Sequence, residues 1–559
     1  MKNIIGGTAR FRYLIVTAAI LAAAASAFGQ KELPISVIQG AKNVSPHDKA
    51  LVKVTGIVTA RIRNGFFVQT PDEKIDADPA TSEGIFVFTR TEPDGDATVG
   101  NLVTVSGTVG EFRPAAELDS LPITQIIMQS GRDLIQVVSR GNELPKPITL
   151  TPEHFSQKVL DELERFEGMR VAVADLTVTQ PTGGRVDIKN NRAESNGVFY
   201  GVVKGLPKPF RLPGYNLYDY IFLNDKAKDD FKKAYPKLPV FGSNPHRLRI
   251  ESTAQLGSQS IDVPAQTGLR NVVGVMHYAY RAYSILTDPT SRPSIANTIT
   301  QVAMPPATDS QVTMAAMNIE NFFDDQDDPE IREDILTTEA FNQRLRKISV
   351  AIRSVMGMPD VIGIVEVEGI AALKRLAEKV NADSEAAGKP NPKYEAYLIE
   401  GNDGRGIDVG FMVKSSKVKV IETKQLGKAD KYKHPQTKED IVLNDRPPLM
   451  LRGAVGDNAG GQPFEFTVVV NHKKSFLGYD DPKQMDNVRL KKRLQAEFLA
   501  KFVQERQKVS PQEKLVLLGD FNAYQFSDGI VDVIGTIKGK PALPGEVLNP
   551  SEDLVDPDM

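Results

Sequence analysis

The sequence contains no cysteine and no tryptophan among its 559 residues. Without cysteine the chain cannot form disulfides, thiolate zinc sites or iron–sulfur clusters, and it has no cysteine nucleophile. It also lacks an excess of either charge, because 68 Lys and Arg oppose 71 Asp and Glu and leave a formal charge of −3. A generically basic coat for nucleic acid is therefore excluded, and any polyanion must be held locally, by a metal or by short basic clusters.

The remaining composition is that of a globular protein. Hydrophobic residues make up 41% of the chain and charged residues 25%, which argues against wholesale disorder and against a polytopic membrane protein. At about 100–200 residues per domain, the length predicts three or four domains. Domains of this size can be stable on their hydrophobic cores without disulfides.

The N-terminus has the pattern of an export signal. Three basic residues precede an apolar, alanine-rich run over 13–25, and Ala25-Ser-Ala27 has a small-x-small pattern. This order is typical of a secretory signal peptide, so we expect removal of residues 1–29 and a periplasmic or extracellular mature protein. A membrane anchor is the alternative, but the run is shorter than the roughly 20 residues that a spanning helix needs. We therefore expect no membrane insertion after cleavage.

Short runs of β-branched and aromatic residues, broken by glycine, fill residues 30–144. Such runs predict a small closed barrel of the oligonucleotide/oligosaccharide-binding (OB) type. Aromatic side chains of this fold can stack on nucleic acid bases. Alternate positions of a small barrel face inward, however, which favours a core role for the four phenylalanines Phe66, Phe67, Phe86 and Phe88.

The β pattern continues over residues 145–300, with Pro- and Gly-rich loops and a short, highly charged helix predicted at 226–235. We interpret this region as a second OB-like barrel, or as a sandwich with insertions. A stretch rich in Pro, Ser and Thr ends it, and we expect residues 301–310 to form a linker.

Residues 311–559 alternate between helical and strand patterns. Apolar residues from Phe341 to Val355 recur at helical spacing and precede a predicted strand at 360–367. A second long helix is predicted at 484–506. This alternation indicates an α/β domain after the β-rich ones.

In this α/β region, four apolar runs end in residues that buried strands disfavour unless these are paired or bind a metal. Carboxylates, carboxamides and a histidine at strand ends suit a hard divalent cation and displacement at phosphorus. A single Asp after a strand is more often a turn or a helix cap, and a single His is more often structural. The set together therefore predicts a site, formed by Asn318, Glu366, His472, Asp520 and Asn522.

Five segments around these residues form a recognisable series. They are Asn318-Ile-Glu-Asn-Phe-Phe-Asp324, Asp360-Val-Ile-Gly-Ile-Val-Glu-Val-Glu368, Gly406-Ile-Asp-Val-Gly-Phe411, Asn471-His-Lys-Lys-Ser475 and Gly519-Asp-Phe-Asn-Ala-Tyr524. In this order they resemble the motifs of the endonuclease/exonuclease/phosphatase superfamily, which has the deoxyribonuclease I-like fold. The likeness is greatest to bacterial extracellular nucleases with barrel-like domains ahead of the nuclease. It implies a four-layer α/β sandwich over residues 311–559.

The resemblance also implies a metal centre and a catalytic histidine. Glu366 would be the principal Mg²⁺ or Mn²⁺ ligand, and Asn318 would complete its shell directly or through water. His472 would donate a hydrogen bond or a proton as the P–O bond breaks. Asp408 would hold His472 in the right tautomer, which is the usual role of such a carboxylate.

Three further residues have roles by the same resemblance. Arg446 would grip a phosphate, for which a planar bidentate donor is suited. Asp520 and Asn522 would orient the attacking water and the developing oxyanion. The expected function is that of an exported, monomeric phosphodiesterase that binds and hydrolyses nucleic acid, with DNA favoured over RNA.

One part of the family pattern has no counterpart here. The family motifs end in Ser/Leu-Asp-His, whose histidine takes part in activating water, and no histidine follows His472 in this sequence. We therefore expect the α/β domain to be truncated, without its last strands and this Asp-His motif. From this we expect poor folding of the domain and little activity.

Charged clusters near the motifs allow more than one interpretation. Basic residues could form a phosphate track, although those on the 484–506 helix are better explained as a solvated face. Two acidic pairs could bind a structural Ca²⁺, although most such pairs only decorate the surface. The basic residues are Lys473, Lys474, Arg489, Lys491, Lys492 and Arg493, and the acidic pairs are Asp327-Asp328 and Asp480-Asp481.

Two other functions compete with the nuclease. The same fold could act on a lipid or a small-molecule phosphate, but no apolar run after residue 310 suggests a membrane-facing hairpin. Alternatively, the chain could be a non-catalytic protein that binds nucleic acid or polysaccharide beside a degraded nuclease domain. The missing Asp-His motif is the best support for this last hypothesis.

Overall fold

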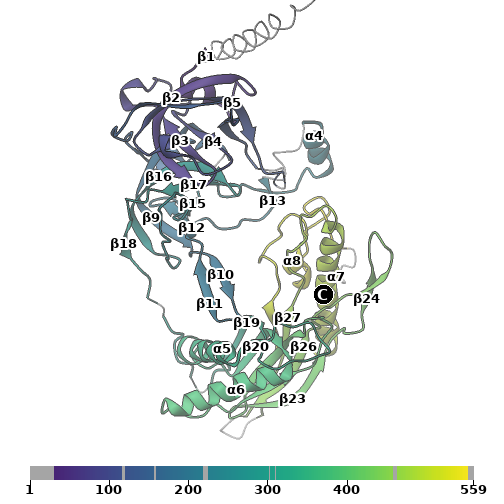
Figure 1. Ribbon diagram of the computed structural model, residues 1–559. Coiled ribbons are helices and arrows are strands. Elements are labelled where there is room, and N and C mark those ends of the chain that lie inside the picture. Colours follow the sequence, from purple (N-terminus) through teal and green to yellow (C-terminus); the bar gives the residue numbers. More distant parts are fainter. Residues whose placement is uncertain are drawn as a thin grey trace, which may run out of the picture. The chain divides into compact units, whose positions relative to one another are not determined.

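The computed structural model describes residues 31–551, with gaps at 116, 118–119, 156–158, 218–224, 301, 309 and 457–461. The predicted signal peptide lies outside the described residues. The chain divides into two compact units, which are treated separately below (Figure 1). Unit 1 comprises Met1–Arg185, Glu194–Arg211 and Gly242–Ile299, and unit 2 comprises Val186–Ala193, Leu212–Phe241 and Thr300–Met559. The predicted boundaries at 144 and 300 and the predicted linker remain predictions.

The first half of unit 1 is a closed barrel. Its strands are β2 (Leu51–Ile62), β3 (Gly65–Gln69), β4 (Gly84–Phe88), β5 (Leu102–Phe112) and β6 (Ile123–Ile127), flanked by β1 (Lys31–Glu32), α2 (Ile35–Gln39) and β7 (Ile135–Ser139). The order β2-β3-β4-β6-β5 closes because β5 also pairs with β2. The pair β4–β6 is parallel, and the other pairs within the ring are antiparallel.

The second half of unit 1 repeats this strand order. It contains β8 (Ile148–Thr149), β9 (Arg170–Gln180), β12 (Val198–Val203), β15 (Leu248–Glu251), β16 (Gly268–Ala279), β17 (Ala282–Thr287) and β18 (Ser294–Asn297). Five of them close as β9-β12-β15-β17-β16, with β16 pairing back to β9 and with β15–β17 parallel. The structure of this region is therefore a barrel and not a sandwich, the two alternatives that the sequence allowed. Whether either barrel is of the OB type remains a prediction.

Three phenylalanines of the first barrel are buried: Phe66 in the barrel's own core, and Phe67 and Phe86 against Val275 and Leu286 of the second barrel. Phe66 and Phe67 have no exposed surface, and Phe86 is 5% exposed. The rings of Phe67 and Phe86 are 4.9 Å apart, and His277 of the second barrel lies 5.5 Å from Phe67. These rings therefore pack the interior of unit 1, which confirms the core interpretation over base stacking.

Unit 1 contains three carboxyl groups whose pKa values are raised: Glu167 is buried, and Glu111 and Glu164 are partly buried. Burial raises the pKa of Glu164 to about 8 and raises that of Glu167 well above its ordinary value, and the charges of neighbouring carboxylates add to both shifts. Glu167 Oε1 accepts a hydrogen bond from the Thr124 backbone N–H at 3.2 Å. Its Oε2 has no partner in the described part of the chain. The folded unit therefore favours the protonated acids.

We expect unit 1 to lose stability as the pH rises from 5 to 8. Above the ordinary pKa of about 4.5 the unfolded chain releases these protons while the folded unit retains them, so the free energy of unfolding falls with pH. The variant Glu167→Gln keeps the Thr124 bond without the ionisation cost. Calorimetry should show its Tm raised by several degrees at pH 8 and little changed at pH 5. The exposed substitution Glu153→Gln is the control, and an equal gain at both pH values would contradict the prediction.

Unit 2 contains two four-stranded sheets. The first has the order β19 (Met314–Phe322), β20 (Val361–Glu368), β22 (Ile407–Lys414), β21 (Tyr394–Leu398), and the second has the order β23 (Val418–Gln425), β26 (Leu449–Val455), β27 (Phe464–His472), β28 (Leu515–Asp520). The sheets pack face to face through valine-rich strands, with Val365, Phe411 and Val468 among the buried residues. A hairpin of β24 (Lys431–Lys433) and β25 (Asp440–Val442) extends from the second sheet.

Helices cover both outer faces of this pair of sheets (Figure 1). On the first sheet lie α5 (Thr338–Val350), continued by a π-helical turn (Ala351–Val355), and α6 (Gly369–Ala386). On the second sheet, Phe498 and Phe502 of α7 (Met485–Val509) pack against Met450 and Val469. The result is the four-layer α/β/β/α arrangement expected for residues 311–559. Both long helices were predicted within a few residues of their observed bounds.

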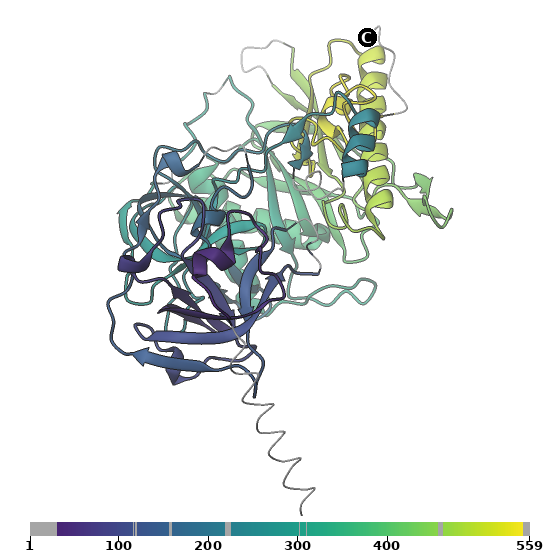
Figure 2. The same ribbon diagram turned by 90° about the horizontal axis from the view of Figure 1, so that it is seen from above.

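The middle of the chain contributes to unit 2 as well. Its elements are the tip of the hairpin β10 (Gly184–Asp187) and β11 (Arg192–Ser195), the pair β13 (Tyr215–Asn216) and β14 (Val240–Phe241), and the predicted charged helix α4 (Asp225–Ala234). The Gly214 N–H donates to the carbonyl of Ser527 at 3.2 Å, and Tyr215 packs near Ile530. This region also holds α8 (Val533–Ile537), which packs on α7, the long yellow-green helix of Figure 2.

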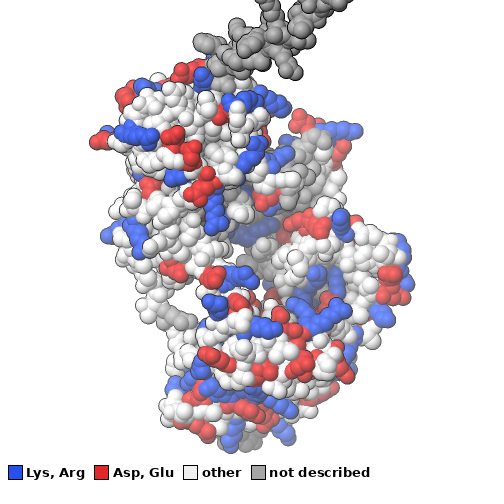
Figure 3. Space-filling model, viewed as in Figure 1, with Lys and Arg blue, Asp and Glu red and all other residues white. Residues whose placement is uncertain are grey.

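The surface carries both charges in alternation. Blue Lys and Arg side chains and red Asp and Glu side chains are mixed over the face shown in Figure 3. This agrees with the near-neutral total and with local rather than general attraction for a polyanion. Within the described ranges, no helix has the length and apolar character needed to cross a membrane.

Candidate active site

The parallel pairs of unit 2 bring the predicted site residues to one edge. In the first sheet β19 runs parallel to β20, with Asn318 opposite Val365, the neighbour of Glu366. In the second sheet β27 runs parallel to β28, with His472 directly opposite Asp520. Because parallel strands end at the same edge of a sheet and the two sheets are stacked, the four polar side chains converge.

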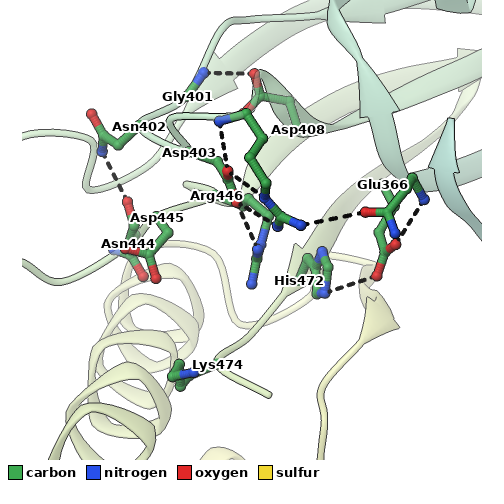
Figure 4. Close-up of polar contacts among 12 residues, drawn as sticks. Glu366, Gly401, Asn402, Asp403, Asp408, Asn444, Asp445, Arg446, His472 and Lys474 are labelled. Atoms are coloured by element: carbon green, nitrogen blue, oxygen red, sulfur yellow. Dashed lines mark hydrogen bonds and ion pairs between the residues drawn. The ribbon is translucent and has the colours of Figure 1, made fainter. Parts of the chain in front are cut away.

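Asn318 joins the two carboxylates of this site. Its Nδ2 donates to Glu366 Oε1 at 3.0 Å and to Asp520 Oδ2 at 3.3 Å, while its Oδ1 accepts from the Glu320 N–H at 2.8 Å. His472 Nε2 lies 3.7 Å from the same Glu366 oxygen (Figure 4). Asn318, Glu366, Asp520 and His472 therefore form one constellation, although Asn318 and Asp520 are 202 positions apart along the chain.

The backbone at Glu366 adopts a conformation that side chains usually avoid. Its φ is 66°, and the pairing of β20 with β22 shifts register between Val365 and Val367. This bulge aims the carboxylate out of the strand, and such strained positions concentrate at functional sites. Asn321 also has a positive φ, and its backbone N–H donates to Glu366 Oε2 at 2.9 Å. Arg344 of α5 holds that turn by donating to the Asn321 carbonyl at 2.8 Å.

The donor set fits a hard divalent cation that also binds water or substrate. Glu366 and Asp520 both direct a carboxylate oxygen at one amide nitrogen, so the space between them favours positive charge. Among the described residues, however, no three His, Asp or Glu side chains have the geometry of a complete metal site. A cation here would therefore draw on water or phosphate oxygens and, for a contribution from Asn318, on its Oδ1, because the amide nitrogen is a donor and cannot bind a cation. A structural Ca²⁺ at either of the two acidic pairs remains a prediction.

His472 is buried, with 5% of its surface exposed. Burial and the positive charge of Arg446 lower its pKa to about 4, against the opposing effect of Glu366. The imidazole is therefore neutral at pH 7 in the free protein. Its Nδ1 has no hydrogen-bond partner in the described part of the chain.

Asp408, the predicted partner of this histidine, is hydrogen-bonded to a different segment of the chain. Its Oδ2 accepts from the Gly401 N–H at 2.9 Å, and its Oδ1 has no partner within the described residues. Burial and the neighbouring Glu400 raise its pKa to about 8. Figure 4 shows the contacts of Asp408 with Gly401 and of His472 with Glu366. The predicted pairing of Asp408 with His472 remains a prediction.

Arg446 shares a carboxylate with a second arginine. Arg446 Nη1 donates to Asp403 Oδ2 at 2.9 Å (Figure 4), and Arg405 Nη2 donates to the same oxygen at 3.1 Å. Burial opposes ionisation of Asp403, but the two guanidinium groups hold its pKa below the ordinary value. Sequence reasoning missed both Asp403 and Arg405, because a polar residue in a glycine-rich loop has no periodic or strand-end signal. Their place directly before the Gly406–Phe411 motif was the only indication.

Asn522 closes the turn after β28. Its N–H donates to Asp520 Oδ1 at 2.8 Å, and its side-chain amide donates to the Lys473 carbonyl at 3.1 Å. Its φ is 47°. Asn522 thus links the loop after β28 to the loop after β27, the strand that ends at His472.

The basic residues near the site are neither a phosphate track nor a solvated face. Lys491 donates to both oxygens of Asp445 at 2.7 Å, and Arg489 donates to the Tyr479 carbonyl at 3.0 Å. Arg493 lies 3.7 Å from Glu497. Lys473 is 3% exposed, and burial lowers its pKa to about 7. These side chains serve packing and internal pairing, so both interpretations of the helix face were wrong.

Lys492 is the most deeply placed of this group, with 2% of its surface exposed. Its Nζ donates to the Lys474 carbonyl at 2.9 Å and to the Asn522 carbonyl at 2.5 Å, and it lies 4.0 Å from the centre of the Phe476 ring. Burial lowers its pKa to about 8. From α7, Lys492 therefore holds together the loop that follows His472 and the loop that contains Asn522.

Replacing Lys492 should loosen the site through these loops. In Lys492→Met both carbonyls lose a buried donor, which should destabilise unit 2 by about 2 kcal/mol and reduce turnover about tenfold. Thermal denaturation and initial rates measure the two effects. Lys508→Met, at an exposed position of the same helix, should change neither. Unaltered stability and rate in the Lys492 variant would show that the two bonds do not hold the loops.

Comparison with known proteins supplies the family. Residues 313–551 match the sequence model described as the Endonuclease/Exonuclease/phosphatase family. Over these residues, the chain is similar in sequence to the endonuclease/exonuclease/phosphatase superfamily. The match covers both sheets of unit 2 and all five motif segments, so the predicted resemblance is confirmed. No curated protein matches the chain.

Solved structures of the superfamily are similar at low identity. A humanized TDP2 of D. rerio shares 17% identity over 38% of this chain and 63% of that one, with a TM-score of 0.22. An endonuclease/exonuclease/phosphatase family protein from Bacteroides thetaiotaomicron shares 16% over 41% and 69%, with a TM-score of 0.24. The mannosyl-6-phosphatase Bt3783 of B. thetaiotaomicron VPI-5482 shares 14% over 42% and 72%, with a TM-score of 0.24. The chain thus spans less than two thirds of the TDP2 structure.

Proposed function

We propose that this chain is an exported, divalent-metal-dependent phosphodiesterase that hydrolyses nucleic acid, with DNA favoured over RNA and with Mg²⁺ or Mn²⁺ as its metal. The observation that carries the proposal is the single Asn318 amide that reaches both Glu366 and Asp520, with His472 3.7 Å from Glu366. Similarity to the superfamily supports a phosphoester substrate. The signal-like N-terminus supports export.

Each site residue has a distinct task in this proposal. Glu366 and Asn318, with Asp520, would hold the cation, which when bound would polarise a phosphate oxygen. His472, buried and neutral in the free protein, donates a hydrogen bond to the departing oxygen, and it could donate a proton only after its imidazole had itself been protonated. Asp408 would fix the tautomer of His472 through a hydrogen bond between Asp408 Oδ1 and His472 Nδ1, which both lack a partner in the described part of the chain.

The remaining residues act on the phosphate and the water. Arg446, held by Asp403, grips the non-bridging oxygens of the phosphate. Asp520 and Asn522 orient the attacking water and the developing negative charge. Most of the rate enhancement would then come from a fixed set of dipoles and charges rather than from covalent chemistry.

The test is metal-dependent hydrolysis by the full chain. Supercoiled plasmid, RNA, sphingomyelin and bis(4-nitrophenyl) phosphate are incubated with the protein, first with Mg²⁺, then with EDTA, then with Mg²⁺ or Mn²⁺ restored.

We expect nicking of plasmid that EDTA abolishes and that added metal restores. Hydrolysis that EDTA does not affect would contradict the metal proposal. Faster release of phosphocholine than nicking of plasmid would favour a lipid substrate. Nucleic acid binding without any metal-dependent turnover would favour the non-catalytic function.

A further inference from the structure

We propose that Arg405 forms a second phosphate subsite, which takes the phosphate next to the one that is cleaved in the same nucleic acid strand. The inference rests on the proposed function and makes it more specific, because it requires a substrate with at least two linked phosphates.

The first support is the way in which Arg405 is held. Its backbone N–H and Nε donate to Asp403 Oδ1 at 3.0 and 3.2 Å, and its Nη2 donates to Oδ2 at 3.1 Å. A side chain fixed by two bonds to one carboxylate, with a third from its own backbone N–H, loses little further freedom when it binds an anion. Arg405 is thus preorganised.

The second support is its exposure compared with that of Arg446. The side chain of Arg405 is 50% exposed, whereas those of Arg446 and Asp403 are 10% and 8% exposed. Arg446 lies close enough to His472 for its charge to lower the pKa of the imidazole. Arg446 is therefore in position to bind the reacting phosphate, and Arg405 is in position to bind a second group at the exposed edge of the site.

The third support is the position of Arg405 relative to the metal ligand. Arg405 Nη1 lies 3.5 Å from Asn321 Oδ1, and the Asn321 N–H donates to Glu366 Oε2 at 2.9 Å. Asn321 thus contacts both Arg405 and Glu366, and it links the two side chains. Two guanidinium groups share the single charge of Asp403, so one positive charge remains for a phosphate. A planar guanidinium with an open edge is suited to a phosphate.

The experiment compares ligands with one and two phosphates. The affinity of the full chain for thymidylyl-thymidine (one phosphate) and for the thymidine trinucleotide TpTpT (two phosphates) is measured by NMR titration. A charge-assisted contact should make the trinucleotide bind about tenfold more tightly. In Arg405→Gln this preference should fall to less than twofold, while the affinity for the dinucleotide should change little.

Two further variants separate charge from structure. Arg405→Lys keeps a charge without the planar fork and should retain part of the preference, whereas Arg452→Gln, which removes an arginine paired with Glu422 and Glu465, should retain all of it. Equal weakening of both ligands in Arg405→Gln would overturn the inference, because Arg405 would then act on the shared phosphate or through Asp403. An absence of preference in the unmodified protein would overturn it too.

A separate measurement distinguishes this failure from failure of the proposed function. Metal-dependent hydrolysis of bis(4-nitrophenyl) phosphate needs only one phosphate. We expect Arg405→Gln to lower kcat/KM for plasmid or oligonucleotide more than tenfold and for this small diester less than threefold. If the unmodified protein hydrolyses the diester but the variant affects both substrates equally, the function stands and the second subsite does not.

Discussion

Replacing Glu366 with glutamine is expected to abolish metal-dependent hydrolysis, with a fall of about a thousandfold or more. Glu366 supplies one of the two carboxylates that meet at Asn318 Nδ2. Glutamine keeps the size of the side chain and an acceptor for the Asn321 N–H, but it removes the charge that attracts a cation. Initial rates on bis(4-nitrophenyl) phosphate across a range of Mg²⁺ concentrations measure the effect. Mn²⁺ binding by calorimetry, which needs no turnover, should weaken in parallel.

Two other substitutions make this test specific. Glu395→Gln removes a carboxylate from β21 in the same sheet and should leave metal binding and rate unchanged. Glu366→Gly removes the carboxylate and also relieves the left-handed backbone, whose φ is 66°. It should therefore be inactive without a loss of thermal stability. Normal rates in Glu366→Gln would mean that the metal, if any, is held elsewhere.

Replacing His472 with alanine is expected to reduce hydrolysis of DNA by roughly a hundredfold to ten-thousandfold while the fold stays intact. If His472 assists the departing oxygen, the loss should depend on the leaving group. The leaving group of DNA is a poorly stabilised alkoxide. The leaving group of bis(4-nitrophenyl) phosphate is a stable phenolate, which needs little assistance. The penalty should therefore be much smaller for the phenolate ester.

The control for His472 is His434→Ala in the hairpin of β24 and β25. His434 only accepts backbone N–H groups of its own turn and should not affect either substrate. Equal losses on both substrates in His472→Ala would assign the histidine to positioning of the metal site rather than to the leaving group. Near-normal rates would remove it from the mechanism.

The candidate site could be predicted because its signal is local. Asn318, Glu366, His472 and Asp520 each follow an apolar run, and the two parallel pairs carry such ends to a common edge. The helix patterns of α5 and α7 were equally local, since one apolar face recurs at helical spacing. Features of this kind depend on only a few consecutive residues.

Other features depend on contacts between distant parts of the chain. A lysine on a helix is usually solvated, but Lys492 is 2% exposed because two loops and an aromatic ring close over it. The left-handed conformation of Glu366 arises from a bulge between β20 and β22. Neither position differs in sequence from an ordinary surface lysine or strand glutamate.

By itself, the sequence determined the family, the strands that carry the chemistry and the residues at their ends. The tertiary structure alone decided that the two barrels share one strand order, that the basic helix face is internal, and that Asp403 holds Arg405 beside Arg446. The physical reason is that hydrophobic periodicity is encoded over a few turns. Burial and the pairing of charges, by contrast, are set by whichever distant segment occupies the neighbouring space.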